Sequence, residues 1–473
     1  MRLDPDELRA RVTALLAANR VEEGAVRYTR PAAKTYPHQW LWDSCFHAHV
    51  HSLLGDAKAA RAELRALFRA QCVDGPDRGR LPHMTFIGAA ARQLGVGEEQ
   101  AAEAQTRDAA LWGNPVASTI TQPPIVADAV RTVGDRAFWR ELWPGLTAYY
   151  DWWLRRRDPD GDGLCAIWHL WESGADATPR GDAACARLLA TGRVPRHLDK
   201  GTHNPTARKR EELVRARFLM LEELQALDGA ELSGALDEVE AQRRRRALLG
   251  LEAVDLQAHL VRNLGDLAFI GDALGELRAA ERYRAAANRI VEAVNATLWD
   301  EARGGYFDRW GAARERLPLW TYAPFVALYA GELVPRSRAE RLLARLVDPA
   351  HFWTRWPLPT VARSEPTFDP DEYWRGSTWL NVNWLVARGL VETAERLADA
   401  RYLPPARAIV DRSLELVART GFREYYRSGA ATPSGDGACE PAAFGPESFS
   451  WSGLALALLA LAEGALADVD PAP

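Results

Sequence analysis

Two carboxylates lie four residues apart in the segment "IWHLWESGADATPR", which spans residues 167–180. Glu172 and Asp176 share this segment with Trp168 and Trp171, whose apolar rings would shield a carboxyl group from water. A shielded carboxylic acid has a raised pKa, which a general acid needs near neutral pH. Either carboxylate could instead brace the loop, and the residue types alone do not decide between the two roles.

Another carboxylate in aromatic surroundings lies far downstream. Glu424 stands in the segment "FREYY", and Glu447, shortly before "FSWSGLAL", competes with it for the same role. Two carboxylates brought together by aromatic loops are typical of glycosidases, in which an acid protonates the leaving oxygen and a base activates water. Sugar-binding modules also use Trp and Asp, so this pattern leaves hydrolysis and binding open.

Two further segments combine aromatic rings with polar side chains. An indole ring stacks on the C–H face of a sugar, and a carboxylate beside it can hold adjacent hydroxyl groups. Arg375 could hold a carboxylate of a neighbouring loop or of a substrate, and the sequence leaves both open. The segment "YPHQWLWDS" supplies Tyr36, Trp40, Trp42 and Asp43, and the segment "YWRGSTWLNVNW" supplies Tyr373, Trp374, Arg375, Gly376 and Trp379.

The spacing of potential metal ligands does not favour a metal site, and we expect neither a metal nor a cofactor. Three aspartates have calcium-loop spacing: Asp158, Asp160 and Asp162. The twelfth position of such a loop would be His169 instead of the required Glu, so we interpret the stretch as a tight Asp/Gly turn. His47 and His51 share a helix face without an acidic ligand at matching spacing, which predicts packed core histidines.

Composition narrows the class of protein. The chain has 473 residues, which is enough for a large core in a globular protein. Its formal net charge of −5 argues against nucleic-acid binding, which needs a concentrated basic face. Five scattered cysteines without a CxxC pair favour reduced thiols and a cytoplasmic location. The N-terminus predicts a charged amphipathic helix and not a signal peptide, and no membrane span is expected. The expected partner is a small carbohydrate, and the sequence leaves a homo-oligomer open.

Helical periodicity dominates the elements that must position these segments. Apolar residues recur at i, i+3 and i+4 spacing in stretches such as 237–274, 275–299 and 451–469. Strand signals are few and short. Helix pairs that alternate with aromatic loops predict an all-α fold in a single domain over residues 1–473, an (α/α)6 barrel whose loops converge at one end. The stretch 196–250 is richer in Arg and Glu and is predicted to be a helical cap inserted into this ring.

Four segments resemble, in order, the signature loops of glycoside hydrolase family sixty-three: "YPHQWLWDSCFHA", "HLWESGADATPR", "YWRGSTWLNVNW" and "FREYY…FSWS". The resemblance spans residues 28–456 and is strongest to the compact bacterial members, which hydrolyse mannosylglycerate or glucosylglycerate. It implies an (α/α)6 barrel and inverting hydrolysis of α-glycosidic bonds. By resemblance, Asp176 is the general acid and Glu424 the general base, with about 6.5–9.5 Å between their carboxyl groups.

The same resemblance implies roles for the remaining site residues. The glycone subsite would be lined by Trp42, Asp43, Gln122, Trp374, Arg375, Gly376 and Trp379, with Tyr373 in the same loop. Tyr36 and Trp40 would lie nearer the leaving group, and Glu172 and Arg180 would support the loop of the acid. The chain departs from the family where "DATPRG" replaces "DNSPRW" and Leu170 follows His169. Candidates in the cap for holding an acidic leaving group are Lys200, His203, Arg215 and Arg217.

These observations together predict an exo-acting, inverting α-glycosidase for a small α-glucoside or α-mannoside, such as glucosylglycerate or mannosylglycerate. A trehalase-like or other α-glucosidase on the same fold is an alternative. A non-catalytic sugar-binding protein is another, because a fold does not determine function. An isomerase is less favoured, since such enzymes use catalytic histidines and the motif loops contain only His38, His47 and His169. The sequence leaves the sugar epimer and the aglycone open.

Overall fold

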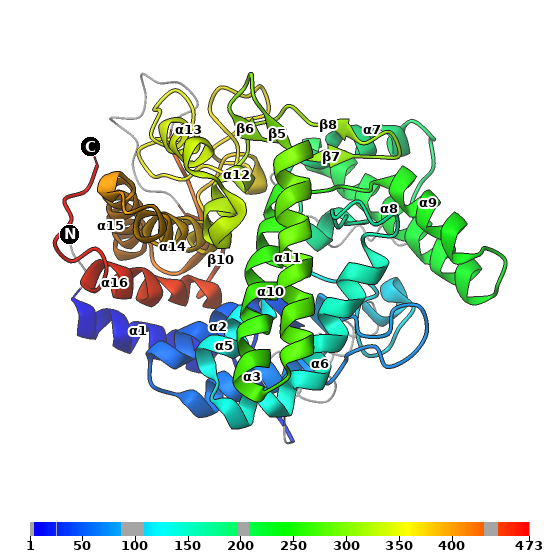
Figure 1. Cartoon of the computed structure of the whole chain (residues 1–473), viewed down its shortest axis with the longest axis horizontal. Coiled ribbons are helices and arrows are strands. Elements are labelled where there is room, and N and C mark those ends of the chain that lie inside the picture. The colour runs from blue at the N-terminus through cyan, green and yellow to red at the C-terminus, as the bar shows by residue number, and fades with distance from the viewer. Residues whose placement is uncertain (1–3, 25, 87–107, 197–207, 430–442, 473) are drawn as a thin grey trace.

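The computed structural model describes residues 4–24, 26–86, 108–196, 208–429 and 443–472 of the chain. Most of the described chain is helical (Figure 1). The longer helices are α1 (Pro5–Ala18), α2 (Leu41–Leu53), α3 (Ala57–Phe68), α5 (Val126–Val133), α6 (Arg136–Arg156), α7 (Asp182–Leu189), α8 (Arg208–Leu232), α9 (Glu238–Leu248), α10 (Val254–Leu274), α11 (Leu277–Thr297), α13 (Arg336–Leu346), α14 (Leu380–Leu397), α15 (Leu403–Thr420) and α16 (Ala455–Glu463), with a short α12 (Ala323–Val326).

Short antiparallel strand pairs accompany the helices of this mostly helical fold, as the few and short strand signals of the sequence allow. Backbone groups of buried loops must find hydrogen-bond partners, and pairing two short segments supplies them. Each strand pair is a separate two-stranded sheet within the described residues, and one of them joins strands that lie on either side of α2 and α3 in the sequence. The pairs are β1 (Arg20–Glu23) with β2 (Val26–Thr29), β3 (Gln39–Trp40) with β4 (Met84–Thr85), β5 (Trp299–Asp300) with β6 (Gly305–Tyr306), β7 (Arg309–Trp310) with β8 (Glu315–Arg316), and β9 (Arg423–Tyr426) with β10 (Ala443–Glu447).

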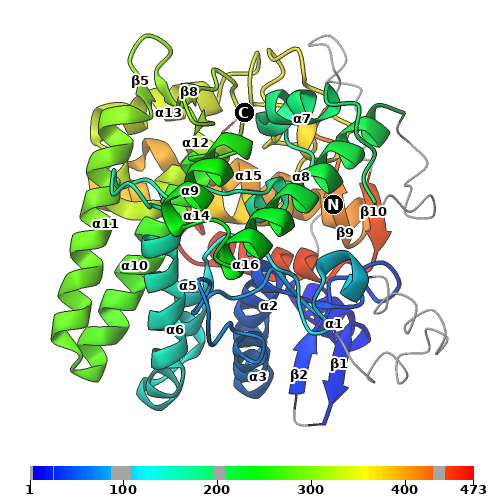
Figure 2. The ribbon, with the colours of Figure 1, turned by 90° about the vertical axis from the view of Figure 1, so that its right-hand side faces the viewer.

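The helices divide into an inner and an outer set. Helices α2, α10 and α14 are buried on nearly every face, whereas α3, α11 and α15 bury one stripe and expose the other. The inner α10 and the outer α11 lie side by side in Figures 1 and 2. Gly275 ends α10 in the left-handed conformation, with φ of 85°, which lets the chain reverse into α11.

Helices α8 and α9 fall within the stretch predicted as a cap, and ion pairs fasten them to α6. Arg156 of α6 holds Glu231 over 2.9 Å and Glu238 over 3.1 Å. Arg245 of α9 is fully buried and binds Glu231 and Asp228, both of α8. In Figure 2 the two helices lie in front of the inner helices. In the described part of the chain, no helix is both long and apolar enough to cross a membrane.

Candidate active site

Asp176 lies on a turn that packs against an indole. A short 3-10 helix, Leu170–Ser173, ends at Gly174, whose φ of 70° is in the left-handed region. A Cβ atom at Gly174 would lie 2.7 Å from the ring of Trp42, so only glycine allows this approach. Burial raises the pKa of Asp176 to about 6, against the opposing positive charge of Arg217. A carboxyl group with this pKa keeps a proton close to neutral pH, as a general acid requires.

Glu172 braces the loop of Asp176. Its two carboxylate oxygens accept hydrogen bonds from both terminal nitrogens of Arg157, at 2.7 and 2.5 Å, and one of them also accepts the backbone N–H of Trp168 at 2.8 Å. Burial opposes the negative charge, but the charge and hydrogen bonds of Arg157 outweigh it and hold the pKa of Glu172 below its usual value. A carboxylate fixed in this way stays ionised and supports the turn.

Arg180 ties the other end of the same loop to the inner helices. Its guanidinium group makes a two-point contact with Asp255 of α10, at 2.8 and 3.0 Å, and lies 3.3 Å from Asp308. All three side chains are buried. The planar guanidinium group matches the carboxylate in geometry, so this contact fixes direction as well as distance.

Glu424 lies on β9 with its carboxylate turned inward. The hydroxyl groups of Tyr373 and Tyr36 donate to the same carboxylate oxygen, at 2.7 and 3.1 Å. The indole N–H of Trp451 holds the Glu424 backbone carbonyl at 3.1 Å. Glu447, the alternative from sequence, is an exposed residue on β10 that pairs with Arg423 at 2.8 Å. The hairpin therefore directs Glu424, and not Glu447, to the interior.

Asp43 is a buried carboxylate close to both candidate catalytic groups. It lies in the first turn of α2, and its Oδ1 atom is buried without a hydrogen-bond partner in the described structure. Burial raises its pKa well above the usual value, and the charges of Glu424 and Asp176 raise it further. The same two carboxylates also affect Tyr36 and Tyr373. Asp43, Asp176 and Glu424 therefore belong to one site.

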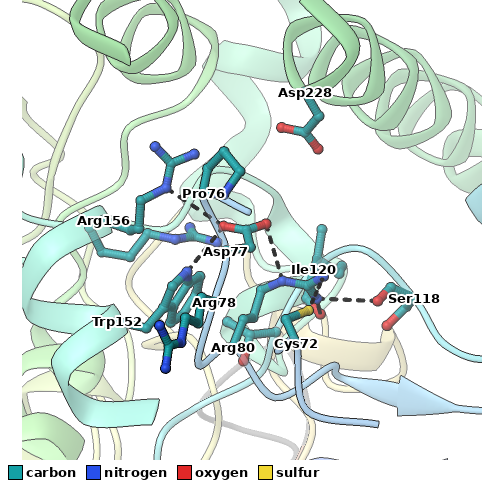
Figure 3. Close-up of polar contacts among 12 residues, drawn as sticks. Cys72, Pro76, Asp77, Arg78, Arg80, Ser118, Ile120, Trp152, Arg156 and Asp228 are labelled. Carbon is teal, nitrogen blue, oxygen red and sulfur yellow. Dashed lines mark hydrogen bonds and ion pairs between the residues drawn. The ribbon is translucent and has the colours of Figure 1, made fainter. Parts of the chain in front are cut away.

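Gln122 connects this site to a buried polar layer. Its side-chain oxygen accepts the backbone N–H of Trp42 at 3.2 Å. The stretch before it is held by Arg80, which donates to the carbonyl oxygens of Ser118 and Ile120 at 3.2 and 3.0 Å. Figure 3 shows how Arg80 is itself fixed by Asp77, which Trp152 and Arg156 of α6 contact from the other side. These contacts orient Gln122 because they hold the backbone segment that leads into it.

The aromatic residues form a stacked wall. Trp374 and Trp379 stack with ring centroids 3.7 Å apart, and Tyr425 stacks on Trp379 at 4.9 Å. Both faces of Trp379 are therefore covered by other rings, so it supports the wall from behind and offers no face to a sugar. Trp42 lies 6.2 Å from Trp374, and Trp40 meets Tyr36 edge to face at 5.7 Å. The sequence indicates that these rings belong to the site, but it does not show which of them are buried behind the others.

Arg375 and Gly376 hold their loop closed. The guanidinium group of Arg375 makes a two-point contact with Asp182, at 3.0 and 2.5 Å, so the protein-loop alternative is the one that the structure adopts. A Cβ atom at Gly376 would lie 2.7 Å from the backbone oxygen of Asp369. These two contacts fix the shape of the loop that carries Trp374.

Of the cap candidates, Arg217 reaches the acid. Its Nη1 atom donates to the backbone carbonyl of Asp176 at 2.8 Å, whereas Arg215 donates to the carbonyl of Arg193 at 3.1 Å. Buried His169 joins the same group, since its Nε2 atom lies 3.0 Å from the Arg217 carbonyl, and burial lowers its pKa to about 4. Lys200 and His203 lie outside the described residues. The contact of His169 with α8 was not predicted from sequence, because it leaves no local signal.

The aspartate turn carries arginines where a calcium ion would lie. The carboxylates of Asp158, Asp160 and Asp162 lie within 4.8 Å of one another. Arg246 pairs with Asp160 at 3.0 Å and Arg309 with Asp162 at 3.2 Å, so protein cations balance this charge. His47 and His51 of α2 have separate hydrogen-bond partners: His47 contacts Ser450 at 2.6 Å and His51 contacts Thr29 at 3.2 Å.

Comparison with known proteins identifies the family of this chain. The profile of the mannosylglycerate hydrolase MGH1-like glycoside hydrolase domain matches residues 36–452. Mannosylglycerate hydrolase of Thermus thermophilus is 33% identical, over 91% of this chain and 96% of its own length. Glucosylglycerate hydrolase of Mycolicibacterium hassiacum is 28% identical, over 91% and 95%.

Solved structures agree with these sequence relatives. The crystal structure of a GH63 mannosylglycerate hydrolase from Thermus thermophilus, in complex with Tris and D-glycerate, has a TM-score of 0.75 at 32% identity. The superposition covers 95% of this chain and 99% of the Thermus thermophilus chain. Neutral trehalase of Saccharomyces cerevisiae has a TM-score of 0.54 at 14% identity, which is a likeness of fold alone.

Proposed function

Because the chain belongs to the mannosylglycerate hydrolase MGH1-like glycoside hydrolases of family sixty-three, we propose that it hydrolyses small α-glucosides or α-mannosides with an acidic aglycone, and that it inverts the anomeric centre. The chain is a glycoside hydrolase that acts on small glycosides. The acidic aglycone and the inversion are the proposal. Glycerate is the favoured aglycone, because relatives of nearly equal length are named for mannosylglycerate and glucosylglycerate.

The proposed scaffold is an (α/α)6 barrel with residues 196–250 as a cap within a single domain. The inner and outer sets of helices support it, since a ring of helical hairpins has one buried and one half-exposed layer. The described free cysteines, Cys45, Cys72, Cys165 and Cys185, suit a reducing compartment, and we place the enzyme in the cytoplasm.

In the proposed reaction Asp176 gives its proton to the glycosidic oxygen as the bond to the anomeric carbon breaks. Glu424 takes a proton from a water molecule, whose oxygen forms the new bond from the opposite face of the sugar. The free sugar and the alcohol of the aglycone leave. Asp176 then regains a proton and Glu424 loses one to solvent, which restores the starting state.

The glycone subsite is proposed to lie between Asp43 and the aromatic wall. The unpartnered oxygen of Asp43 suits a sugar hydroxyl group, which would supply the missing hydrogen bond. Trp42 lies beside it, with the buried ring of Trp374 behind at a centroid distance of 6.2 Å, and Gln122 can donate its amide N–H. Tyr36 contacts Glu424 and Trp40 meets Tyr36, so both are proposed to lie on the side of the base and not, as the resemblance implies, nearer the leaving group.

The position of Arg217 supports the proposal that the aglycone is acidic. It is a buried cation that touches the backbone of the proposed acid, so its charge lies on the side of the leaving group. A carboxylate on the aglycone would find a favourable charge there, whereas a second neutral sugar would not. This placement favours a glycerate conjugate over trehalose.

The observation that carries the proposal is the contrast between the two carboxyl groups. Asp176 is half-buried and has a pKa raised to about 6 by desolvation, and the carboxylate of Glu424 receives two phenol hydrogen bonds. Environments that push two carboxyl groups toward opposite protonation states mark an acid and a base.

The test is hydrolysis of mannosylglycerate, glucosylglycerate and trehalose, with the released anomer followed by NMR. We expect a glycerate conjugate to be cleaved fastest and the β-anomer to appear first. Asp176→Ala and Glu424→Ala should each lose about 10³-fold or more in kcat while still binding substrate, because each removes one arm of acid–base catalysis. Release of the α-anomer, or full activity in either variant, would contradict the assignment. Tight binding without hydrolysis would point to a sugar-binding protein.

A further inference from the structure

Two phenols converge on one oxygen atom of Glu424. Tyr373 donates to Oε1 over 2.7 Å and Tyr36 donates to the same atom over 3.1 Å. They come from distant parts of the chain, Tyr36 from the stretch before β3 and Tyr373 from the turn before α14. A hydrogen bond donated to a carboxylate stabilises its charged form and restricts the rotation of the carboxyl group.

Both phenols remain donors at the pH at which such an enzyme works. Burial raises the pKa of Tyr36 and of Tyr373 well above its usual value, and the negative charge of Glu424 raises both further. Neither hydroxyl group therefore ionises near neutral pH. The proton that leaves the attacking water goes to Glu424, and the two tyrosines keep theirs.

Among the described residues, two further carboxyl groups face Glu424. Asp43 of α2 and Asp176 of the acid loop face the same site. On its own strand, Arg423 pairs with Glu447 at 2.8 Å, and directly after the strand Arg427 pairs with Asp371 at 2.7 Å. On the paired strand β10, the residue beside Glu424 is a glycine, and the nearby turn contributes the indole of Trp451 to its backbone.

In the described part of the chain, the two side-chain donors to the Glu424 carboxylate are neutral phenols, whereas cations hold other buried carboxylates of this protein. Glu172 is held by Arg157 and Asp255 is held by Arg180. A guanidinium group in contact with a carboxylate lowers its pKa strongly and makes it a poor base. Phenols favour the ionised form more weakly, so a carboxylate held by them stays charged and keeps its basicity.

We propose that Tyr36 and Tyr373 are positioning residues for the general base, and that their hydroxyl groups together fix the plane of the Glu424 carboxyl group and keep it ionised beside two other carboxylates. This rests on the proposed role of Glu424. It assigns to the two hydroxyl groups a task on the enzyme itself, beyond the contact with substrate that their position in the sequence motifs implies.

The pH dependence of kcat/KM separates this task from a substrate contact. Removing a donor destabilises the ionised form, so the pKa of Glu424 rises and the acid limb of the profile moves to higher pH. We expect Tyr373→Phe and Tyr36→Phe each to move this limb up by about one pH unit, and the double variant by about two. Loss of a substrate contact would raise KM and leave the limb in place.

A second substitution gives the opposite sign without loss of the ring. Site-specific 3-fluorotyrosine at position 373 carries a more acidic hydroxyl group, which is a stronger donor, so the acid limb should move to lower pH. This measurement keeps the question answerable if a phenylalanine variant fails to fold. Tyr306→Phe is the matched control, because this buried tyrosine on β6 loses one hydrogen bond, to Asn295 at 2.8 Å, at a distant site. It should keep the wild-type profile.

The outcomes are distinct. An acid limb that stays in place in the phenylalanine and the fluorotyrosine variants overturns the positioning role, whatever happens to KM. Full activity of Glu424→Gln overturns the proposed base itself, and with it the inference. Inactive Glu424→Gln with an unmoved limb in the tyrosine variants leaves Glu424 as the base and removes only the task of the two phenols.

Discussion

At the scale of single residues, the surroundings of the Asp176 carboxyl group determine its pKa and therefore its use as an acid. Burial raises its pKa to about 6, and the positive charge of Arg217 acts in the opposite direction. A general acid must carry its proton before the glycosidic oxygen can accept it. Activity is therefore present below this pKa and declines as the pH rises through it. We expect the basic limb of the kcat/KM profile to lie near pH 6 for this reason.

Arg217→Met tests this balance of burial and charge. Without the cation the pKa of Asp176 rises, so the basic limb should move to higher pH by about half a unit to one unit. The KM for a glycerate conjugate should also rise about tenfold, since a charge-assisted contact is lost. Arg215→Met is the matched control, because Arg215 lies on the same helix but donates to Arg193. Equal pH profiles for the two variants would show that Arg217 does not act on the acid.

At the scale of elements, the helices could be predicted from the sequence, but how deeply each site residue is buried could not. The amphipathic pattern of α11 and the Ala/Leu run of α16 follow from local spacing. Trp379 and Trp374 look alike in sequence, but only the packing of Tyr425 shows that Trp379 has both faces covered. The short hairpins were missed because two or four paired residues leave little periodic signal.

The hairpin of β9 and β10 also decides between Glu424 and Glu447, and it requires a glycine. Gly445 has a φ of 76°, and a Cβ atom there would lie 2.6 Å from Oε2 of Glu424 and 2.7 Å from its Cβ. Gly445→Ala should therefore displace the carboxyl group and lower kcat by about 10²-fold, since misplacement of a catalytic group by about 1 Å has effects of that size.

Gly421→Ala separates this steric effect from backbone strain. Gly421 precedes β9 with a φ of 80°, and an added Cβ atom would meet nothing within 4 Å. This variant should lose some stability, because alanine is strained in this conformation, but it should keep its kcat. A Gly445→Ala enzyme as active as Gly421→Ala would show that the carboxyl group tolerates the added methyl group.

At the scale of the whole molecule, buried ion pairs join segments that are remote in sequence. Arg388 of α14 makes a two-point contact with Asp128 of α5, both bonds 2.9 Å long, across a separation of 260 residues. Asp128 also meets His49 of α2 at 3.2 Å and Arg262 of α10 at 3.3 Å. Four inner helices thus meet at one carboxylate. Composition and spacing cannot reveal such a contact, because its partners are related only through the closed fold.

Arg388→Met should test how far this contact stabilises the closed arrangement. Methionine preserves much of the side-chain volume but leaves Asp128 short of its main partner, and breaking a buried pair from one side costs about 3–5 kcal/mol. Urea unfolding followed by circular dichroism measures this change in the free energy of unfolding. Arg65→Met is the matched control, because its pair with Glu141 is half exposed and should matter by about 1 kcal/mol or less.

The pH dependence of stability provides a second, independent test of the contact between Arg388 and Asp128. Burial opposes the charge of Asp128, but Arg388, His49 and Arg262 together outweigh it, with Arg388 as the largest of the three, and hold the pKa of Asp128 well below its usual value. A group with a lowered pKa in the folded state contributes stability above its unfolded pKa of about 4, and the contribution is lost as the pH falls through the folded pKa. The destabilisation by Arg388→Met should therefore be largest near neutral pH and shrink toward low pH. A penalty equal at all pH values, or no larger than that of Arg65→Met, would mean that packing and not charge joins these helices.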